Sequence, residues 1–415
     1  MWKKGSILLL ALMLLLVGCS SEASLVRDSI AASLEKPNYD YHGTLKLTGD
    51  IEKLPQALGE EENKEFAAFA AALKAGLTVS GSQKDLQNTK LVLSVSDDKL
   101  LREKGLWTGE KNASVELLLN DDRLYIKTPL DQKHLLVDTQ MQQPFPTASG
   151  MSETSAIDPV KWKDFHDKMN KLVLDFMKKY IATYGYKLSD AKNLGTETVA
   201  LPNGQSVEAT HVTMELDLKE LVDMLLYTAK DATTNADVKT FAVDFMVLTQ
   251  SLSEEMDPAV KKTTEAEKRA AAEATVTIGL TALKEWLDTE GKKYTSDEIV
   301  KMAKAEGLDE LKWNLDFYID ENKMPVRQKG TFSVTFHAPK WKEPLTIGLE
   351  SDQYMYNFGK ATAYPIPKAD ETVTVEQLEK DKEAVSAFHE TGFLRKLLEL
   401  ALEEKKARLN KGSAP

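Results

Sequence analysis

The chain of 415 residues is long enough for one large domain or two ordinary ones. Hydrophobic residues make up 42% of it and charged residues 28%, so it can bury a core and is not a disordered stalk. A formal net charge of -12 gives the protein no attraction to phosphate backbones, and we expect no nucleic-acid partner.

The first residues have the pattern of an export signal. Lys3 and Lys4 precede an unbroken apolar run from Ile7 to Val17, and Cys19 follows closely. The run is shorter than the ~20 apolar residues that a membrane-spanning helix needs, so it is typical of a cleaved signal peptide. Cys19 is the only cysteine in the chain. It therefore has no intramolecular disulfide partner.

The segment Leu16 to Cys19 resembles the lipobox of bacterial lipoproteins. In that family the cysteine thiol receives a diacylglycerol, and cleavage then makes this cysteine the new N-terminus. The resemblance implies a signal peptide at 1–18, a lipidated tether at 19–24 and a body held at the extracytoplasmic face of the cell membrane. The alternative is a chance cysteine at the end of an apolar segment.

In the first half of the body, apolar residues recur mainly at every second position, as in β-strands. A helical spacing at 25–34 is followed by strict alternation of apolar and polar residues from Tyr39 to Thr48, which predicts a strand with one covered face. After a helix at 60–75, short strands separated by polar turns predict an antiparallel meander. These strands are expected at 77–82, 90–96, 114–120, 123–128 and 134–138.

In the middle of the chain, apolar residues recur mainly with the spacing of α-helices. A linker-like stretch at 147–156 leads into an amphipathic helix at 159–184. A hairpin at 194–216 is expected to turn at Asn203-Gly204 through a type I′ turn. Further helices are predicted at 217–227, 236–252, 258–289 and 296–306. We interpret the region of about 217–306 as a helical insertion that covers the sheet.

Strands return near the end. Alternation in 311–320, 331–337 and 345–358 predicts strands with an unusually aromatic covered face. The residues expected to line an apolar ligand site on this face are Trp313, Phe317, Phe332, Phe336 and Tyr356. The alternative is that helices fill the same space as an ordinary core. The segment 371–415 is predicted to be a C-terminal helix.

The lipobox, the meander, the inserted helices and the segment LDFYIDENKMPVRQKGTFSVTF together resemble the LolA/LolB and LppX-type lipoproteins. In that family a half-open β-barrel with helices across its mouth holds acyl chains or whole lipids. The resemblance covers residues 25 to 370 as a pattern. It implies an α+β fold in which a curved antiparallel sheet, a LolA-like half-open barrel, is covered by amphipathic helices.

No recognisable catalytic or metal motif accompanies this pattern. Ser33 and Ser189 begin bare S-x-x-K matches, but neither of the companion motifs S-D-N and K-T-G follows. The six histidines are scattered singly along the chain. We therefore expect no enzyme, no metal site and no cofactor.

The sequence leaves two functions open. The first is a membrane-anchored binding protein that carries a lipid or another long hydrophobic ligand between sheet and helices. The second is a non-enzymatic interaction or structural lipoprotein that assists an envelope complex, with an exposed apolar patch along Phe388 to Leu402. The ligand, the protein partners, the oligomeric state and the number of membranes in the host stay open.

Overall fold

The computed structural model describes residues 21–54, 64–85, 87–138, 159–256, 260, 262–337, 343–392 and 394–399. The signal peptide, Cys19 and the predicted linker at 147–156 lie outside these residues. Contacts divide the chain into two units. We call them the helical unit, within Met1–Glu35, Gln140–Glu197 and Glu208–Pro325, and the sheet unit, within Lys36–Thr139, Thr198–Val207 and Val326–Pro415.

In the sheet unit, consecutive strands pair with one another. The meander consists of β1 (Tyr39–Gly49), β2 (Leu77–Gln83), β3 (Asn88–Val95), β4 (Ser114–Asn120), β5 (Arg123–Lys127) and β6 (His134–Asp138). Each strand pairs antiparallel with the next, which confirms the predicted meander. On the other side of β1 lie β11 (Leu345–Tyr356) and then β10 (Pro325–Phe336), also antiparallel.

The register aligns apolar side chains across neighbouring strands of this sheet. Leu91, Leu117, Ile126 and Leu135 are successive cross-strand partners on β3, β4, β5 and β6. Side chains on one pleat of neighbouring strands share a face, so these four form an apolar row. The opposite face also carries apolar side chains, because Leu118 of β4 and Tyr125 of β5 are cross-strand partners there and both are buried.

Short helical elements cover the two ends of this row. Helices α4 (Lys64–Ala75) and α5 (Lys99–Glu103) enclose a cluster around Trp107, and the 3-10 turn η1 (Ile51–Lys53) precedes them. At the far edge, η3 (Ala369–Glu371), the strand β12 (Thr372–Thr374), α11 (Val375–Lys380) and η4 (Lys382–Ala387) follow one another. β12 pairs with β6 in parallel, and Phe388 is buried there beside Leu135.

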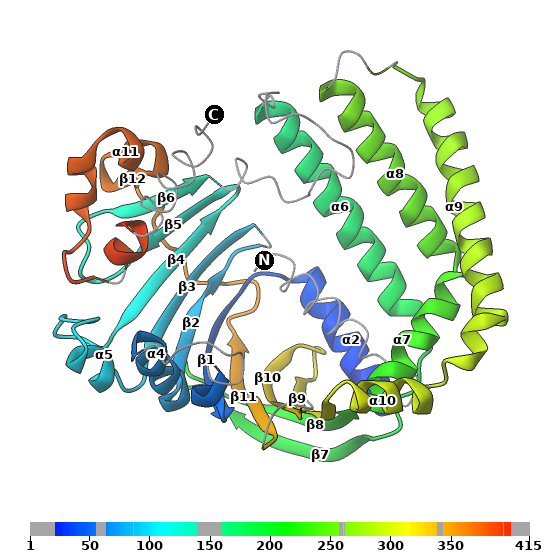
Figure 1. The fold of residues 1–415 in the computed structure, drawn as a ribbon, viewed down its shortest axis with the longest axis horizontal. Coiled ribbons are helices and arrows are strands. Elements are labelled where there is room, and N and C mark those ends of the chain that lie inside the picture. Colours follow the sequence, from blue (N-terminus) through cyan, green and yellow to red (C-terminus); the bar gives the residue numbers. More distant parts are fainter. Residues whose placement is uncertain are drawn as a thin grey trace. The chain divides into compact units, whose positions relative to one another are not determined.

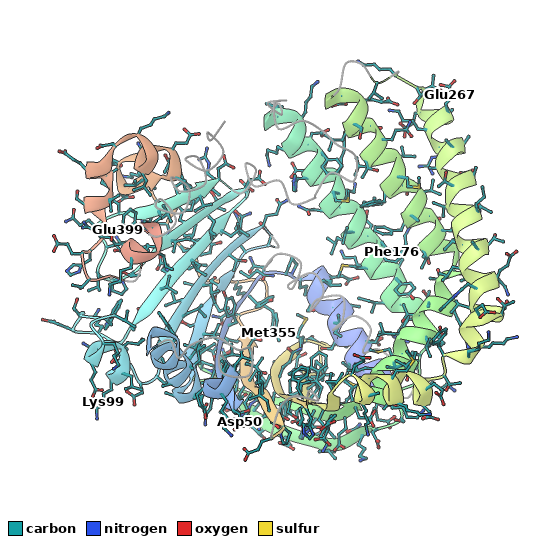
Figure 2. The ribbon with its side chains drawn as sticks, in the orientation of Figure 1. Asp50, Lys99, Phe176, Glu267, Met355 and Glu399 are labelled. Atoms are coloured by element: carbon teal, nitrogen blue, oxygen red, sulfur yellow. The ribbon has the colours of Figure 1, made fainter. Side chains whose placement is uncertain are left out.

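The helical unit contains the predicted amphipathic helices. They are α2 (Ser21–Glu35), α6 (Pro159–Thr183), α7 (Leu218–Ala232), α8 (Ala236–Met256), α9 (Glu265–Asp288) and α10 (Ser296–Ala305), with the 3-10 turn η2 (Glu290–Lys293) between α9 and α10. Figure 1 shows α6, α8 and α9 side by side, with α9 outermost. Phe176 of α6 stacks on Phe241 of α8 at 4.3 Å between ring centroids (Figure 2).

This unit also contains β8 (Ser206–Asp217), β9 (Leu308–Asp320) and most of β7 (Ala191–Ala200). β8 and β9 pair antiparallel. Their inner faces pack with α2, α7 and the segment after α6 in one filled core. Its largest members include Tyr184, Met214, Met224 and Phe317, all buried.

Together the strands form one twelve-stranded, mostly antiparallel sheet that is not closed. The strand order runs β12-β6-β5-β4-β3-β2-β1-β11-β10-β9-β8-β7. The coarse prediction of an α+β fold on a large antiparallel sheet is therefore confirmed. Among the described residues, none of the helices combines the length and apolar character that a membrane crossing requires.

Two local predictions were wrong. A type I′ turn at Asn203-Gly204 needs positive φ at both residues, but only Gly204, at φ 84°, has it. The Gly204 amide donates to the Leu201 carbonyl and the Leu201 amide donates to Gln205, which makes a longer loop. The predicted C-terminal helix is broken within its described part, because Asp381 and Phe388 adopt extended backbone.

Candidate functional site: a pocket beside helix α7

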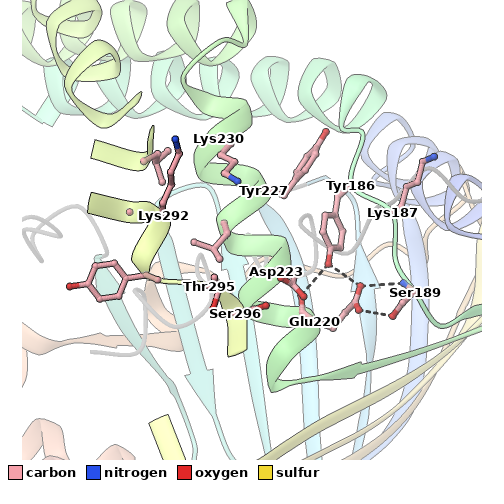
Figure 3. Close-up of a pocket in the computed structure, with 14 residues that line it drawn as sticks. Tyr186, Lys187, Ser189, Glu220, Asp223, Tyr227, Lys230, Lys292, Thr295 and Ser296 are labelled. Carbon is pink, nitrogen blue, oxygen red and sulfur yellow. Dashed lines mark hydrogen bonds between the residues drawn. The ribbon is translucent and has the colours of Figure 1, made fainter. Parts of the chain in front are cut away.

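A cavity of about 650 Å³ lies in the helical unit beside α7. This volume falls in the range of about 300 to 1,000 Å³ that is usual for small-molecule sites. We call it the α7 pocket (Figure 3). It is lined by Tyr186, Lys187, Ser189, Glu220, Asp223, Leu226, Tyr227, Lys230, Leu287, Gly291, Lys292, Tyr294, Thr295 and Ser296.

Helix α7 supplies one wall of the pocket. It begins at Asp217, whose carboxylate accepts a hydrogen bond of 2.8 Å from the Glu220 amide. From Glu220 to Lys230 the lining residues recur every three or four positions, so they share one side of the helix. The cap thus fixes where this row of side chains starts.

The segment between α6 and β7 forms a second wall, and hydrogen bonds tie it to α7. Tyr186 donates its hydroxyl to Glu220 Oε1 at 2.9 Å, and the Ser189 hydroxyl donates to Oε2 at 2.6 Å. The Ser189 amide donates to the same carboxylate at 3.2 Å. Burial, and then the hydrogen bond and charge of Glu220, raise the pKa of the Tyr186 phenol. Tyr186 therefore remains a donor at neutral pH.

The third wall comes from the end of α9, η2 and the start of α10. Trp286 stacks on Tyr294 with ring centroids 6.1 Å apart. The Thr295 hydroxyl caps α10 by accepting from the Glu298 amide at 3.3 Å. Lys219 of α7 bridges to this wall by donating to Ser296 Oγ at 2.8 Å. The pocket is thus assembled from three separate stretches of sequence.

Tyrosine rings form the apolar floor. The Tyr227 ring lies 5.4 Å from the rings of both Tyr184 and Tyr186. Tyr184 is also hydrogen-bonded to Thr228 at 2.6 Å, and burial raises its pKa to about 12. These contacts hold the rings in place, so the floor is preformed.

The charges of the pocket are unequally satisfied. The Glu220 carboxylate has its three donors, and Asp223 lies 3.5 Å from Lys219. In contrast, Lys187, Lys230 and Lys292 form no salt bridge or side-chain hydrogen bond with the described residues. Figure 3 places Lys230 and Lys292 on the same side of the pocket. The hydrogen bond from Lys284 is the main cause that lowers the pKa of Asp288, and the charges of Lys292 and Lys230 lower it further, so both lie near Asp288. The side chains of the pocket that lack an ion-pair partner among the described residues are therefore cationic.

The predicted lining residues lie elsewhere. Trp313 and Phe317 pack into the filled core of the helical unit. In the sheet unit, Phe332 pairs with Leu349 and Phe336 with Leu345, which places both rings on one face, whereas Tyr356 lies on the opposite face of β11. None of the five lines the α7 pocket. Cys19, the predicted lipidation site, lies outside the described residues.

A buried histidine was also missed, because its partners are far apart in sequence. His211 of β8 lies 2.8 Å from Glu197 and 2.7 Å from Asp316, and its ring stacks on Tyr318 at 4.3 Å. Each ring nitrogen thus faces a carboxylate oxygen. The cluster ties three strands together and lies outside the pocket.

The described residues contain no group of three or more His, Cys, Asp or Glu side chains placed to hold a metal ion. Comparison with known protein families and with curated proteins finds no match to this chain.

Proposed function

We propose that this protein is a lipid-anchored, extracytoplasmic binding protein without enzymatic activity, and that its ligand site is the α7 pocket. The lipobox at Leu16 to Cys19 supports the anchor, and the preformed, ligand-sized pocket supports the binding function. The open, mostly antiparallel sheet is compatible with the LolA-like scaffold that we propose for the fold.

The observation that carries the binding proposal is that the pocket combines lysines without ion pairs, acids that already have partners, and tyrosine rings. The acids of the pocket are already paired, while Lys230 and Lys292, which line the pocket together with Tyr227, form no salt bridge with the described residues. The chemistry that fits is a flat or apolar body carrying one anionic group. A lipid lying between sheet and helices is less favoured in the helical unit, because side chains fill its core.

The test uses 8-anilinonaphthalene-1-sulfonate, a fluorescent probe with an aromatic body and one anionic group, titrated into the full chain. We expect the double variant Lys230→Gln/Lys292→Gln to bind the probe about tenfold more weakly, the effect of losing about 1.4 kcal/mol of charge-assisted bonding. Lys304→Gln, an exposed lysine of α10 outside the pocket, is the matched control and should bind like the parent protein. Equal affinity of the double variant and the control would refute the site.

A second function, an interaction lipoprotein, is favoured by exposed apolar side chains on the helices. Ile278, Trp286 and Met302 are 70%, 46% and 54% exposed, whereas Phe388, in the patch expected from sequence, is buried. Crosslinking in cells distinguishes the two functions. A stoichiometric protein partner whose capture requires these three side chains supports the second function, and its absence contradicts it.

A further inference from the structure

Two partly exposed aromatic rings lie at one end of the α7 pocket. Tyr294 lines the pocket, and its ring stacks on Trp286 of α9 with 6.1 Å between centroids and 19° between planes. Figure 3 shows Tyr294 at the end of the pocket away from Ser189. Trp286 is 46% exposed and Tyr294 is 42% exposed. We call these two rings the aromatic rim, because they continue the apolar lining of the pocket outward.

The backbone of η2 fixes the position of both rings. A Cβ at Gly291 would lie 3.2 Å from two carbon atoms of the Trp286 ring, so this ring lies against the glycine. The Tyr294 amide donates a 3.0 Å hydrogen bond to the Gly291 carbonyl. Leu287, next to Trp286, is buried and lines the pocket. The rim is therefore preformed, and a ligand that contacts it orders few side chains.

The charges near the rim indicate which part of a ligand it suits. Glu285 and Asp288 are exposed acids close to Trp286 in the sequence of α9, so an anionic group is not favoured there. Lys230 and Lys292, which form no salt bridge with the described residues, line the pocket itself. An anionic group therefore belongs in the pocket. An uncharged planar ring suits the rim, because it can stack on the two aromatic side chains.

We propose that the aromatic rim is a second subsite of the α7 pocket, and that Trp286 determines which anions bind there. The ligand class is an anion with two planar or apolar portions. One portion lies over the Tyr227 floor, and the other is an uncharged ring that lies on Trp286 and Tyr294. This inference rests on the proposed function, because the rim extends the site that the pocket provides.

Two probes that differ by one ring test the subsite by calorimetry on the full chain. Naphthalene-1-sulfonate and 8-anilinonaphthalene-1-sulfonate each carry one anionic group, and only the second has a further phenyl ring. We expect Trp286→Ala to weaken binding of the larger probe about fivefold, the effect of losing one stacked ring, and to leave the smaller probe unchanged. Trp286→Phe keeps an aromatic face and should retain most of the affinity. Ile278→Ala, at another exposed apolar position of α9 outside the pocket, is the matched control and should bind both probes like the parent protein.

Failure of the subsite and failure of the proposed function give different results. If the parent protein binds neither probe, or if Lys230→Gln/Lys292→Gln binds the smaller probe like the parent, both proposals are wrong. If that double variant weakens both probes while Trp286→Ala binds the larger one like the Ile278→Ala control, only the subsite is refuted. Equal weakening of both probes by Trp286→Ala also refutes the subsite. Trp286 is half-exposed, so circular dichroism should show unchanged folding of its variants.

Fluorine NMR tests the contact itself. In the full chain labelled with fluorotryptophan, the Trp286 resonance is the one that Trp286→Phe removes. We expect the larger probe to shift this resonance and the smaller probe to leave it in place. A Trp286 resonance that does not move when the larger probe saturates the pocket would contradict the subsite.

Discussion

Gly81 illustrates how one missing side chain shapes the sheet unit. The Tyr41 side chain of β1 crosses over β2 at this glycine, and its hydroxyl donates a 2.8 Å hydrogen bond to the Lys90 carbonyl on β3. A Cβ at Gly81 would lie 2.5 Å from the Tyr41 hydroxyl oxygen and 2.0 Å from the Lys90 carbonyl oxygen. Burial raises the pKa of Tyr41, so the phenol stays protonated and remains a donor.

Gly81→Ala is therefore expected to destabilise the protein by about 1 to 3 kcal/mol, because the tyrosine ring and the neighbouring strand must both shift. Urea unfolding followed by circular dichroism measures the change. Gly279→Ala on α9 is the control, since nothing lies within 4 Å of its added methyl group and alanine favours a helix by about 1 kcal/mol. Similar stabilities of the two variants would contradict the close contact at Gly81.

At the scale of elements, one buried ion pair joins α8 to α9. Lys268 donates to Glu254 at 2.8 Å and to Ser251 Oγ at 3.0 Å, and the Thr263 hydroxyl donates to Glu254 at 2.6 Å. The hydrogen bonds from Lys268 and then from Thr263 lower the pKa of Glu254 to about 2. Its ordinary value is 4.5, so the stability that the charged form contributes is complete above pH 4.5. It declines as the pH falls towards 2.

Lys268→Met should lower the melting temperature at pH 7 by several degrees, because Glu254 then stays buried without its cation. It should also reduce the loss of stability between pH 4.5 and 2, since the pKa of Glu254 moves back towards its ordinary value. Thermal unfolding at a series of pH values measures both effects. Lys284→Met removes only an exposed pair within α9 and should change stability by less than about 0.5 kcal/mol. A Lys268→Met variant as stable as this control would be inconsistent with the ion pair.

Elements with strong periodicity were predictable from sequence, and those decided by distant contacts were not. β4 and β6 begin and end at the predicted residues, and α6 ends one residue early, because alternation or helical spacing determines each of them. Residues 375–392 also have helical spacing, yet they form only the short helix α11 and the 3-10 turn η4, after which Phe388 is buried beside Leu135 of β6. Tertiary packing overrides local preference there.

At the scale of the whole molecule, the fold class could be predicted from sequence and a lipobox-like motif recognised in it, but the pocket could not be predicted. The α7 pocket draws on residues near 187, 225 and 292, which no motif connects. Its shape depends on the angles at which α7, η2 and α10 meet, and periodicity does not specify such angles. Phe317, one of the aromatic residues predicted to line a ligand site, packs in a core instead.

The anchor is a prediction about the whole molecule, because it decides where both units operate. An acyl chain gains about 0.8 kcal/mol for each methylene buried in the bilayer, and two or more chains hold a protein stably. We therefore expect the parent protein to sediment with membranes, and to incorporate a labelled fatty acid in cells. Cys19→Ala should abolish the label and move the protein out of the membrane fraction. Ser20→Ala, the adjacent control, should behave like the parent, whereas a Cys19→Ala protein that keeps both properties would show that the lipobox is not used.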